Sequence, residues 1–176
     1  ELEKALGAFN PDCLLSAIFN HRIPDNLRQW AVHQSVNLHP APLPAIRTPS
    51  PWFWPVRLRM RESEICVHHM TDTLDGGPVI VRHHLTLDAN ETQGTYAAKV
   101  NDAAPLVMKR LHELLMAPPL PAGEVQHDGH YYPAVQETGL EIDFSQPIAE
   151  VDALVRACNP YHPARVLFRG RELWIH

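Results

Sequence analysis

Short apolar runs separated by polar turns predict the strands of this chain. Residues 13–19 form a near-continuous apolar run, a pattern typical of a strand buried on both faces in a parallel sheet. Residues 35–38 predict a second strand, and residues 65–70 and 78–82 predict a third and a fourth. The order of these runs along the chain favours a mostly parallel sheet with flanking helices.

A long helix follows the strands. Between residues 92 and 117, apolar side chains recur at steps of three and four, which is the period of one buried helix face. Two consecutive prolines, at 118–119, end the pattern. A shorter helix is predicted over residues 24–31. Strands alternating with helices over residues 1–117 indicate an α/β layered domain.

Residues 118–176 differ from the part before them. They begin as a Pro-rich linker, and the spacing of apolar residues predicts a short helix over 148–158. Two further strands, 165–168 and 172–175, are joined by Arg-Gly-Arg and predict a hairpin. We interpret this part as a linker followed by a small α+β lobe.

The predicted sheet has few strands for its class. Open α/β sheets usually have more than three or four strands, and this chain opens in a helix-like segment, residues 1–9, without a preceding strand. Either the domain is unusually small or its first strands are absent from this chain. An unpaired edge would then remain on the sheet, so we expect a homodimer or a partner chain that supplies the missing strands.

Composition narrows the classes of function. The chain has 176 residues with a formal net charge of −5, which fits one domain with a small appendage and argues against a nucleic-acid surface. Neither a membrane-spanning apolar run nor a secretory signal is visible, so no membrane partner is expected. The three cysteines are scattered without a CxxC pattern, which predicts reduced thiols and a cytoplasmic protein.

Three polar residues suggest acyl-transfer chemistry. Asn37 and His39 lie two residues apart at the end of a predicted strand, so their side chains can share one side. Asp75 lies in the turn after the next strand, and we expect it at the same edge of the sheet. An amide and an imidazole can donate to an oxyanion, the imidazole can move a proton, and a carboxylate can orient it. A substrate amine could attack directly, without a protein nucleophile.

The segments around these residues resemble a known family. Residues 36–44, Val-Asn-Leu-His-Pro-Ala-Pro-Leu-Pro, are similar to the Asn-x-His-Pro segment of the folate-dependent formyltransferases, which include methionyl-tRNA, glycinamide ribonucleotide and sugar-nucleotide formyltransferases. Residues 65–80 resemble the family's next strand and Asp-x-Gly turn, and residues 92–96 resemble the start of the following helix. Residues 142–144 and 155–160 resemble segments that follow the catalytic domain. Order and spacing agree over nearly the whole chain.

This resemblance implies a fold, a reaction and roles for single residues. The fold would be an incomplete, Rossmann-like formyltransferase domain, truncated at its amino terminus. The formyl donor would be 10-formyltetrahydrofolate and the acceptor a primary amine. Asn37 and His39 would stabilise the oxyanion, and Asp75 would orient His39. The implied binding residues are Phe19, Asn20, Arg22, Ile23, Thr73 and Leu74 for the folate, and Arg47 and Trp54 for the substrate.

The chain departs from the family pattern at three positions. Ala41 replaces a Ser, Thr48 replaces a Gly that follows Arg47 in the family, and Gly76 replaces a Thr. We expect Thr48 to alter the path of its loop and Gly76 to loosen the turn at Asp75. Gly76 and the glycine after it are also expected to supply positive φ angles in that turn.

Several interpretations remain open from the sequence alone. The acceptor is expected to be an amino sugar nucleotide or another small metabolite, because tRNA would call for a larger, basic carboxy-terminal domain. The same three residues would also suffice to hydrolyse formyltetrahydrofolate. A third alternative is a catalytically silent domain that serves as an assembly module. Histidine doublets at 68–69 and 83–84 place one side chain on each strand face, and no metal site is predicted from them.

Overall fold

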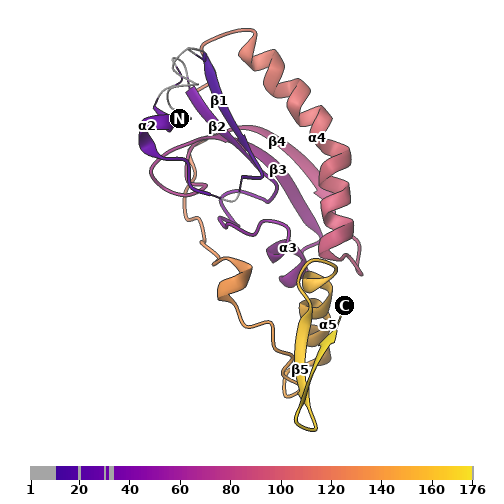
Figure 1. The fold of residues 1–176 in the computed structure, drawn as a ribbon. Coiled ribbons are helices and arrows are strands. Elements are labelled where there is room, and N and C mark those ends of the chain that lie inside the picture. Colours follow the sequence, from indigo (N-terminus) through magenta and orange to yellow (C-terminus); the bar gives the residue numbers. More distant parts are fainter. Residues whose placement is uncertain (1–10, 20, 30, 32–33, 176) are drawn as a thin grey trace.

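The computed structural model describes residues 11–19, 21–29, 31 and 34–175. The helix-like segment predicted over residues 1–9 lies outside the described residues. Every strand and helix predicted within them is present, with ends shifted by a few residues. In chain order the elements are β1 (Cys13–Ala17), α2 (Asp25–Arg28), β2 (Gln34–His39), α3 (Trp54–Arg57), β3 (Glu62–His69), β4 (Val79–Thr86), α4 (Gln93–Leu115), the 3₁₀ turn η1 (Val135–Glu137), α5 (Ile148–Cys158), β5 (Ala164–Phe168) and β6 (Arg171–Ile175) (Figure 1).

The larger sheet is mixed. Its strand order is β1-β2-β3-β4, in which β1 and β2 are parallel while β3 runs antiparallel to both β2 and β4. The expectation of a mostly parallel sheet is therefore wrong for these strands. A parallel connection needs roughly a dozen residues or more, and the loop 70–78 between β3 and β4 is too short for one. Apolar runs do not reveal strand direction, because a strand covered on both faces reads the same whichever way its neighbours run.

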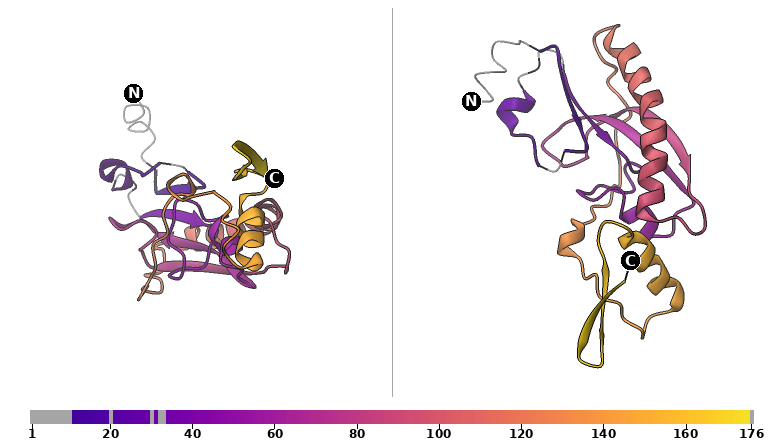
Figure 2. Two further views of the ribbon diagram at one scale, coloured as in Figure 1. Left: turned by 90° about the horizontal axis from the view of Figure 1, so that it is seen from below. Right: turned by 45° about the vertical axis from the view of Figure 1, so that its right-hand side comes forward.

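Helix α4 covers one face of this sheet (Figure 1, Figure 2). Its residues Val100, Val107 and Leu111 are buried in the main hydrophobic core. Val36 and Leu38 of β2 belong to the same core. Since side chains alternate along a strand, the residues between and after these two point to the opposite face of the sheet. That opposite face is the one available for a site.

The start of α4 is tied to the end of β2. Thr92 and Thr95 form a reciprocal capping box that satisfies backbone N–H groups at the helix start. One turn later, the Tyr96 hydroxyl donates to the carbonyl of Pro40 at 2.8 Å and is paired with the Ser63 hydroxyl at 2.6 Å. These buried hydrogen bonds hold the first turn of α4 against the chain segment that follows β2.

The carboxy-terminal lobe lies at one end of the molecule (Figure 1). Its helix α5 packs against α3. The Glu150 carboxylate of α5 accepts a hydrogen bond from Arg57 at 2.8 Å and forms an ion pair with Arg59 at 2.6 Å. The antiparallel hairpin β5–β6 extends beyond α5, with Leu167 and Trp174 exposed. The predicted helix and hairpin are confirmed, whereas the division of the chain at residue 117 stays a prediction.

Strand β1 forms one edge of the larger sheet, since β2 is its neighbour on one side and no strand of the described ranges pairs with its other side. The expected homodimer or partner chain along this edge stays a prediction. None of the helices in the described part of the chain is long and apolar enough to cross a membrane.

Candidate active site

The sheet face opposite α4 brings the predicted polar residues together. Asn37 and His39 share this face, and the strand register pairs Asn37 with His68 of β3. The loop that carries Asp75 follows a different path from the one expected. Because β3 runs antiparallel to β2, the loop 70–78 begins at the far end of β2 and folds back along the sheet. The expectation of a shared carboxyl edge is wrong, and the returning loop places Asp75 beside the two β2 residues.

The turn that carries Asp75 is tightly built. The positive φ expected at its glycines falls instead on Asp75 itself, at 51°, a conformation that aspartate tolerates better than most residues. Gly77 is required for another reason: a Cβ atom there would lie 1.8 Å from the carbonyl oxygen of His69. A Cβ at Gly76 would lie 2.7 Å from Cγ2 of Thr73. The two glycines thus allow close packing of the turn against β3.

His39 and Asp75 form a buried pair. Nε2 of His39 lies 2.9 Å from the carbonyl oxygen of Ile46, so this nitrogen carries a hydrogen and donates it. Nδ1 of His39 faces Oδ2 of Asp75 at 3.4 Å. The backbone N–H of Thr48 donates to the same carboxylate oxygen at 3.1 Å. The Nδ1 atom is therefore the ring nitrogen that remains for proton transfer.

Asn37 and His68 complete the cluster on the other carboxylate oxygen. The Asn37 amide donates to Oδ1 of Asp75 at 3.4 Å and lies 3.2 Å from Nε2 of His68. Nδ1 of His68 is 2.9 Å from the carbonyl of His69, which fixes its hydrogen there. His68 is almost fully buried and holds the Asn37 amide in place. In this arrangement His68 is a positioning residue for the amide and the carboxylate.

Burial and charge set the protonation of this cluster. Burial lowers the pKa of His39 below its ordinary value, although the nearby Asp75 carboxylate acts in the opposite direction. For Asp75, burial acts to raise the pKa, but the charge of His39 and contacts with His68 and Thr48 outweigh it and lower the pKa. His39 is thus neutral at neutral pH while Asp75 is ionised. On acidification His39 protonates first, and its charge keeps Asp75 ionised to lower pH.

The geometry suits transfer of a proton from a cationic group. With His39 neutral, its Nδ1 lone pair and Oδ2 of Asp75 are two acceptors that face each other across 3.4 Å. An ammonium or another donor that approaches from the side can donate a hydrogen bond to each of them. None of the four clustered side chains carries a hydroxyl or thiol nucleophile. Among the residues that the structure describes, no group of three or more His, Cys, Asp and Glu side chains could hold a metal ion.

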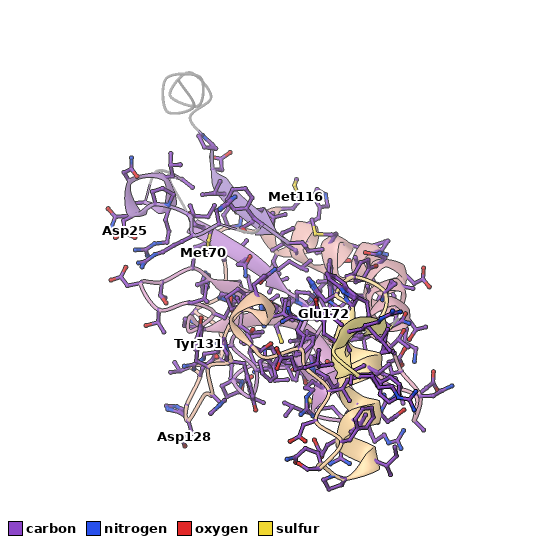
Figure 3. The ribbon with its side chains drawn as sticks, turned by 60° about the horizontal axis from the view of Figure 1, so that its bottom comes forward. Asp25, Met70, Met116, Asp128, Tyr131 and Glu172 are labelled. Atoms are coloured by element: carbon purple, nitrogen blue, oxygen red, sulfur yellow. The ribbon has the colours of Figure 1, made fainter. Side chains whose placement is uncertain are left out.

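The cluster opens into a cavity of about 780 Å³. Asn37, His39 and Asp75 line it, and so do five of the residues implied for the folate: Phe19, Arg22, Ile23, Thr73 and Leu74. Asn20 lies outside the described residues. In Figure 3 Met70 and Tyr131, which also line the cavity, lie on the same side of the molecule.

The wall of this cavity fits a flat heteroaromatic ring. Ile18, Phe19 and Leu74 are exposed apolar side chains in the two loops that contribute to the wall, residues 18–23 and 70–75. Exposed apolar groups that gather at a concave site mark ligand-binding surfaces. The residues present therefore fit the folate that the resemblance implies.

Arg47 and Trp54, which the resemblance implies for substrate binding, do not line this cavity. Nε of Arg47 donates to the Gln126 side chain at 3.1 Å, and its guanidinium packs against Gly129. Nε1 of Trp54 donates to the carbonyl of Pro133 at 2.9 Å. Both side chains are occupied in holding the following segment of the chain. Trp52, two residues before Trp54, lines the cavity in its place.

The chain segment 124–135 braces the catalytic turn. The side-chain amide of Gln126 donates to the carbonyls of Asp75 and Gly77 at 2.8 and 2.6 Å. Glu124 exchanges two backbone hydrogen bonds with Val79 at the start of β4, at 2.9 and 2.8 Å. We call residues 124–135 the strap. It secures the backbone of the turn at Asp75 and Gly77.

Sequence reasoning missed His68, Thr48 and Gln126. His68 was visible only as half of a histidine doublet, and its contact with Asn37 depends on an antiparallel register that the apolar pattern does not reveal. Thr48 acts through its backbone N–H, which any residue but proline supplies. Gln126 lies in a segment that reads as a polar linker. Strand alternation could have identified His68. Once the pairing of β2 with β3 is known, the alternation of side chains places His68 on the same sheet face as Asn37.

Comparison with known proteins identifies the family of this chain. Residues 1–111 match the formyl transferase family model. Methionyl-tRNA formyltransferase of Dechloromonas aromatica is 29% identical over 178 residues, which cover 99% of this chain and 57% of that protein. The corresponding enzyme of Lachnospira eligens is 26% identical over 97% of this chain and 54% of its own length. The chain thus spans a little over half the length of these relatives.

Solved structures share the fold. A 4-N formyltransferase from Francisella tularensis superposes with a TM-score of 0.82 at 17% identity, over 99% of this chain and 74% of its own. HypX from Aquifex aeolicus, in complex with tetrahydrofolic acid, superposes with a TM-score of 0.78 at 16% identity, over 96% of this chain and 29% of its own. With a family match that covers well over half of its residues, this chain belongs to the formyl transferase family.

Proposed function

We propose that this protein transfers a formyl group from 10-formyltetrahydrofolate to the primary amine of a small metabolite, such as an amino sugar nucleotide. The observation that carries the proposal is the His39–Asp75 pair. Its Nδ1 and Oδ2 atoms stand 3.4 Å apart, with the Asn37 amide on the other carboxylate oxygen, in the wall of one cavity. An amide, an imidazole and a carboxylate at one point are the groups that acyl transfer to an amine requires.

The ionisation of the pair supports a proton path. An amine reaches the site as an ammonium, and neutral Nδ1 of His39 beside ionised Asp75 accepts its proton. The free amine then attacks the formyl carbon, and the bond between this carbon and the folate nitrogen breaks. The imidazolium donates an Nδ1–H hydrogen bond to the oxyanion and afterwards gives this proton to the leaving nitrogen, with Asp75 stabilising its charge. The attacking nitrogen, which is positively charged after the attack, loses its second proton to water in the cavity, so the neutral formamide forms as the folate nitrogen leaves. The Asn37 amide becomes the second donor to the oxyanion when one of its two hydrogens turns from Asp75, which lies at the longer distance of 3.4 Å, toward the substrate.

Two structural relatives support the proposed formyl donor and the proposed acceptor. HypX was crystallised with tetrahydrofolic acid, and WlaRD, a sugar 3N-formyl transferase, with dTDP and 5-N-formyl-THF. WlaRD superposes on 81% of this chain and 52% of its own with a TM-score of 0.67 at 18% identity. Such likeness shows the fold, and the lining of the cavity by Phe19 and Leu74 is the feature of this chain that favours a folate donor.

Replacement of His39 tests the proposal. His39→Ala should lower formyl transfer to an amino sugar nucleotide by about 10²- to 10⁴-fold, because it removes the group that moves the proton. Transfer is followed by the absorbance change on tetrahydrofolate formation and by mass spectrometry of the formylated amine. His84→Ala is the matched control, since His84 is 77% exposed and outside the cavity wall.

Each other result has a definite meaning. A His39→Ala protein with wild-type turnover would contradict the proposal. Release of formate at the same rate with and without amine would show hydrolysis of the donor instead. A wild-type protein that neither binds tetrahydrofolate nor turns over formyltetrahydrofolate would show a silent domain. Thermal melting monitored by circular dichroism establishes that both variants are folded.

A further inference from the structure

Two buried polar atoms beside the cavity have no hydrogen-bond partner among the described residues. They are Oε1 of Gln93, the first residue of α4, and Nε1 of Trp52. Gln93 is only 5% exposed, and both residues line the cavity that holds His39 and Asp75. Buried polar groups are nearly always paired, so an unpaired one in a cavity wall calls for an explanation. A ligand bound in the cavity can supply such a partner.

These two residues belong to a wall distinct from the folate-implied loops. Gly94, next to Gln93, packs so closely on the lobe that a Cβ atom there would lie 2.7 Å from Pro160, and its N–H donates to the carbonyl of Asn159 at 3.1 Å. Tyr161 and His162, which follow directly, also line the cavity. Figure 1 shows α2, after the 18–23 loop, and α5, before residues 161–162, at opposite ends of the molecule.

The two walls differ in charge. The folate-implied wall contains Arg22, Arg28 and Asp72. The segments 48–52, 131–136 and 161–162, with Gln93, contribute no Asp, Glu, Lys or Arg to the lining. Burial also lowers the pKa of His162, so this side chain is neutral at neutral pH. The second wall therefore offers aromatic faces and uncharged hydrogen-bonding groups, which suit a neutral ring with hydroxyl groups.

We propose that Gln93 determines acceptor specificity by accepting a hydrogen bond from a hydroxyl group near the reacting amine, with the Trp52 N–H as a second polar contact. The last side-chain torsion of glutamine is soft, so a small rotation of the amide brings Oε1 from its buried position to the surface of the cavity. The acceptor is thus an amine on an uncharged, hydroxyl-bearing ring, the class to which amino sugars belong. This inference rests on the proposed function and narrows its substrate.

A pair of acceptors and one substitution test this role. The acceptors are a dTDP-linked 4-amino-4,6-dideoxyhexose and its analogue without the neighbouring hydroxyl. Gln93→Leu should raise KM for the hydroxylated acceptor by about 10- to 100-fold, because a site built to bind a hydroxyl loses that bond. It should leave kcat, KM for the formyl donor and KM for the deoxy analogue unchanged. Trp52→Phe, which keeps a ring but lacks the N–H, should raise KM for the hydroxylated acceptor less.

Two controls separate recognition from folding. Gln146→Leu removes the same amide from an exposed position outside the cavity wall and should leave every constant unchanged. Gln93→Leu should melt at or above the wild-type temperature, because it removes a buried oxygen that has no partner in the folded chain. A melting temperature well below the wild type would show that Gln93 has a structural role instead and would overturn the inference.

The remaining outcomes are decisive and distinguishable. An unchanged KM of Gln93→Leu for the hydroxylated acceptor would overturn the inference while leaving formyl transfer intact. Equal losses for the hydroxylated and deoxy acceptors would also overturn it, because the lost contact would not involve the hydroxyl. If the wild-type protein formylates neither of the two sugar acceptors nor methionine amide, the proposed function fails. This result is seen with the wild-type protein before any variant is compared.

Discussion

The polar cluster around Asp75 and the apolar residues Ile18 and Phe19 line the same cavity but differ in how they are held. His39, His68 and Asp75 are almost completely buried, and each has two or more polar contacts within the protein. In the loop, Phe19 is 56% exposed and its ring contacts His21 at the surface. The cluster is held by polar contacts within the protein, while the loop leaves apolar surface in water.

This difference separates two tasks. Proton transfer needs groups fixed to within a few tenths of an ångström, and a sheet face with a braced turn provides that. Binding of an apolar ring needs surface that becomes buried only when the ligand arrives. Substitutions in the cluster should therefore change the rate of the reaction, whereas substitutions in the loop should change affinity. Three experiments can break or sharpen this contrast.

The largest effect is expected at Asp75. Asp75→Asn removes the charge that stabilises protonated His39, so kcat should fall about 10²- to 10⁴-fold while the Kd for tetrahydrofolate changes little. Since Asp75 acts to raise the pKa of His39, the acidic limb of the residual activity should also move to lower pH. Asp102→Asn, on the exposed face of α4, is the control. A variant that loses affinity but keeps kcat would reverse the contrast.

A smaller effect is expected at Phe19. Phe19→Ala should weaken tetrahydrofolate binding about tenfold, the order of magnitude of losing part of an aromatic side chain's burial. The free energy of unfolding should stay within about 0.5 kcal/mol of the wild type, because the ring contributes little to the core. Titration calorimetry measures the Kd. Phe168→Ala, equally exposed in the hairpin but outside the cavity, should bind as the wild type does.

The smallest effect concerns stability and pH. The pKa of His39 is lower in the folded chain than its ordinary value of about 6.5, so the unfolded chain binds more protons between these two values. Stability is therefore full above about pH 6.5 and falls as the pH drops through the folded pKa of His39. His162 adds to the same trend. His39→Asn should flatten the dependence in urea titrations at pH 7.5 and 5.5, and His84→Asn should retain it.

The fold was predictable where local pattern decides it. The period of three and four over α4 and the Pro-Pro stop give its limits to within a few residues, because one buried helix face leaves a repeating signature. Strand direction was not predictable, since β3 is buried on both faces and a strand covered on both faces reads the same in either direction. The short helix α3 was also missed, because its Trp-Pro start lies at the end of a proline-rich stretch.

Which residues form the site was easier to predict than how the fold brings them together. Asn37 and His39 follow from strand alternation, and their polar character at a strand end singles them out. Asp75 was chosen correctly for proximity but by a wrong route, since the loop returns along β2 instead of ending at a shared edge. His68 and Gln126 act through contacts between segments far apart in the chain. No local pattern encodes such contacts.

The strap has a practical consequence for anyone who shortens this protein. A version that ends at the Pro-Pro pair after α4 would keep all of the four-stranded sheet. It would lose the Gln126 side-chain amide, which donates hydrogen bonds to the carbonyls of Asp75 and Gly77. Such a version would retain the shape of the domain with an unsupported catalytic carboxylate. A shortened version that keeps this support extends at least to Val135, whose N–H donates to the Ser50 hydroxyl at 2.9 Å.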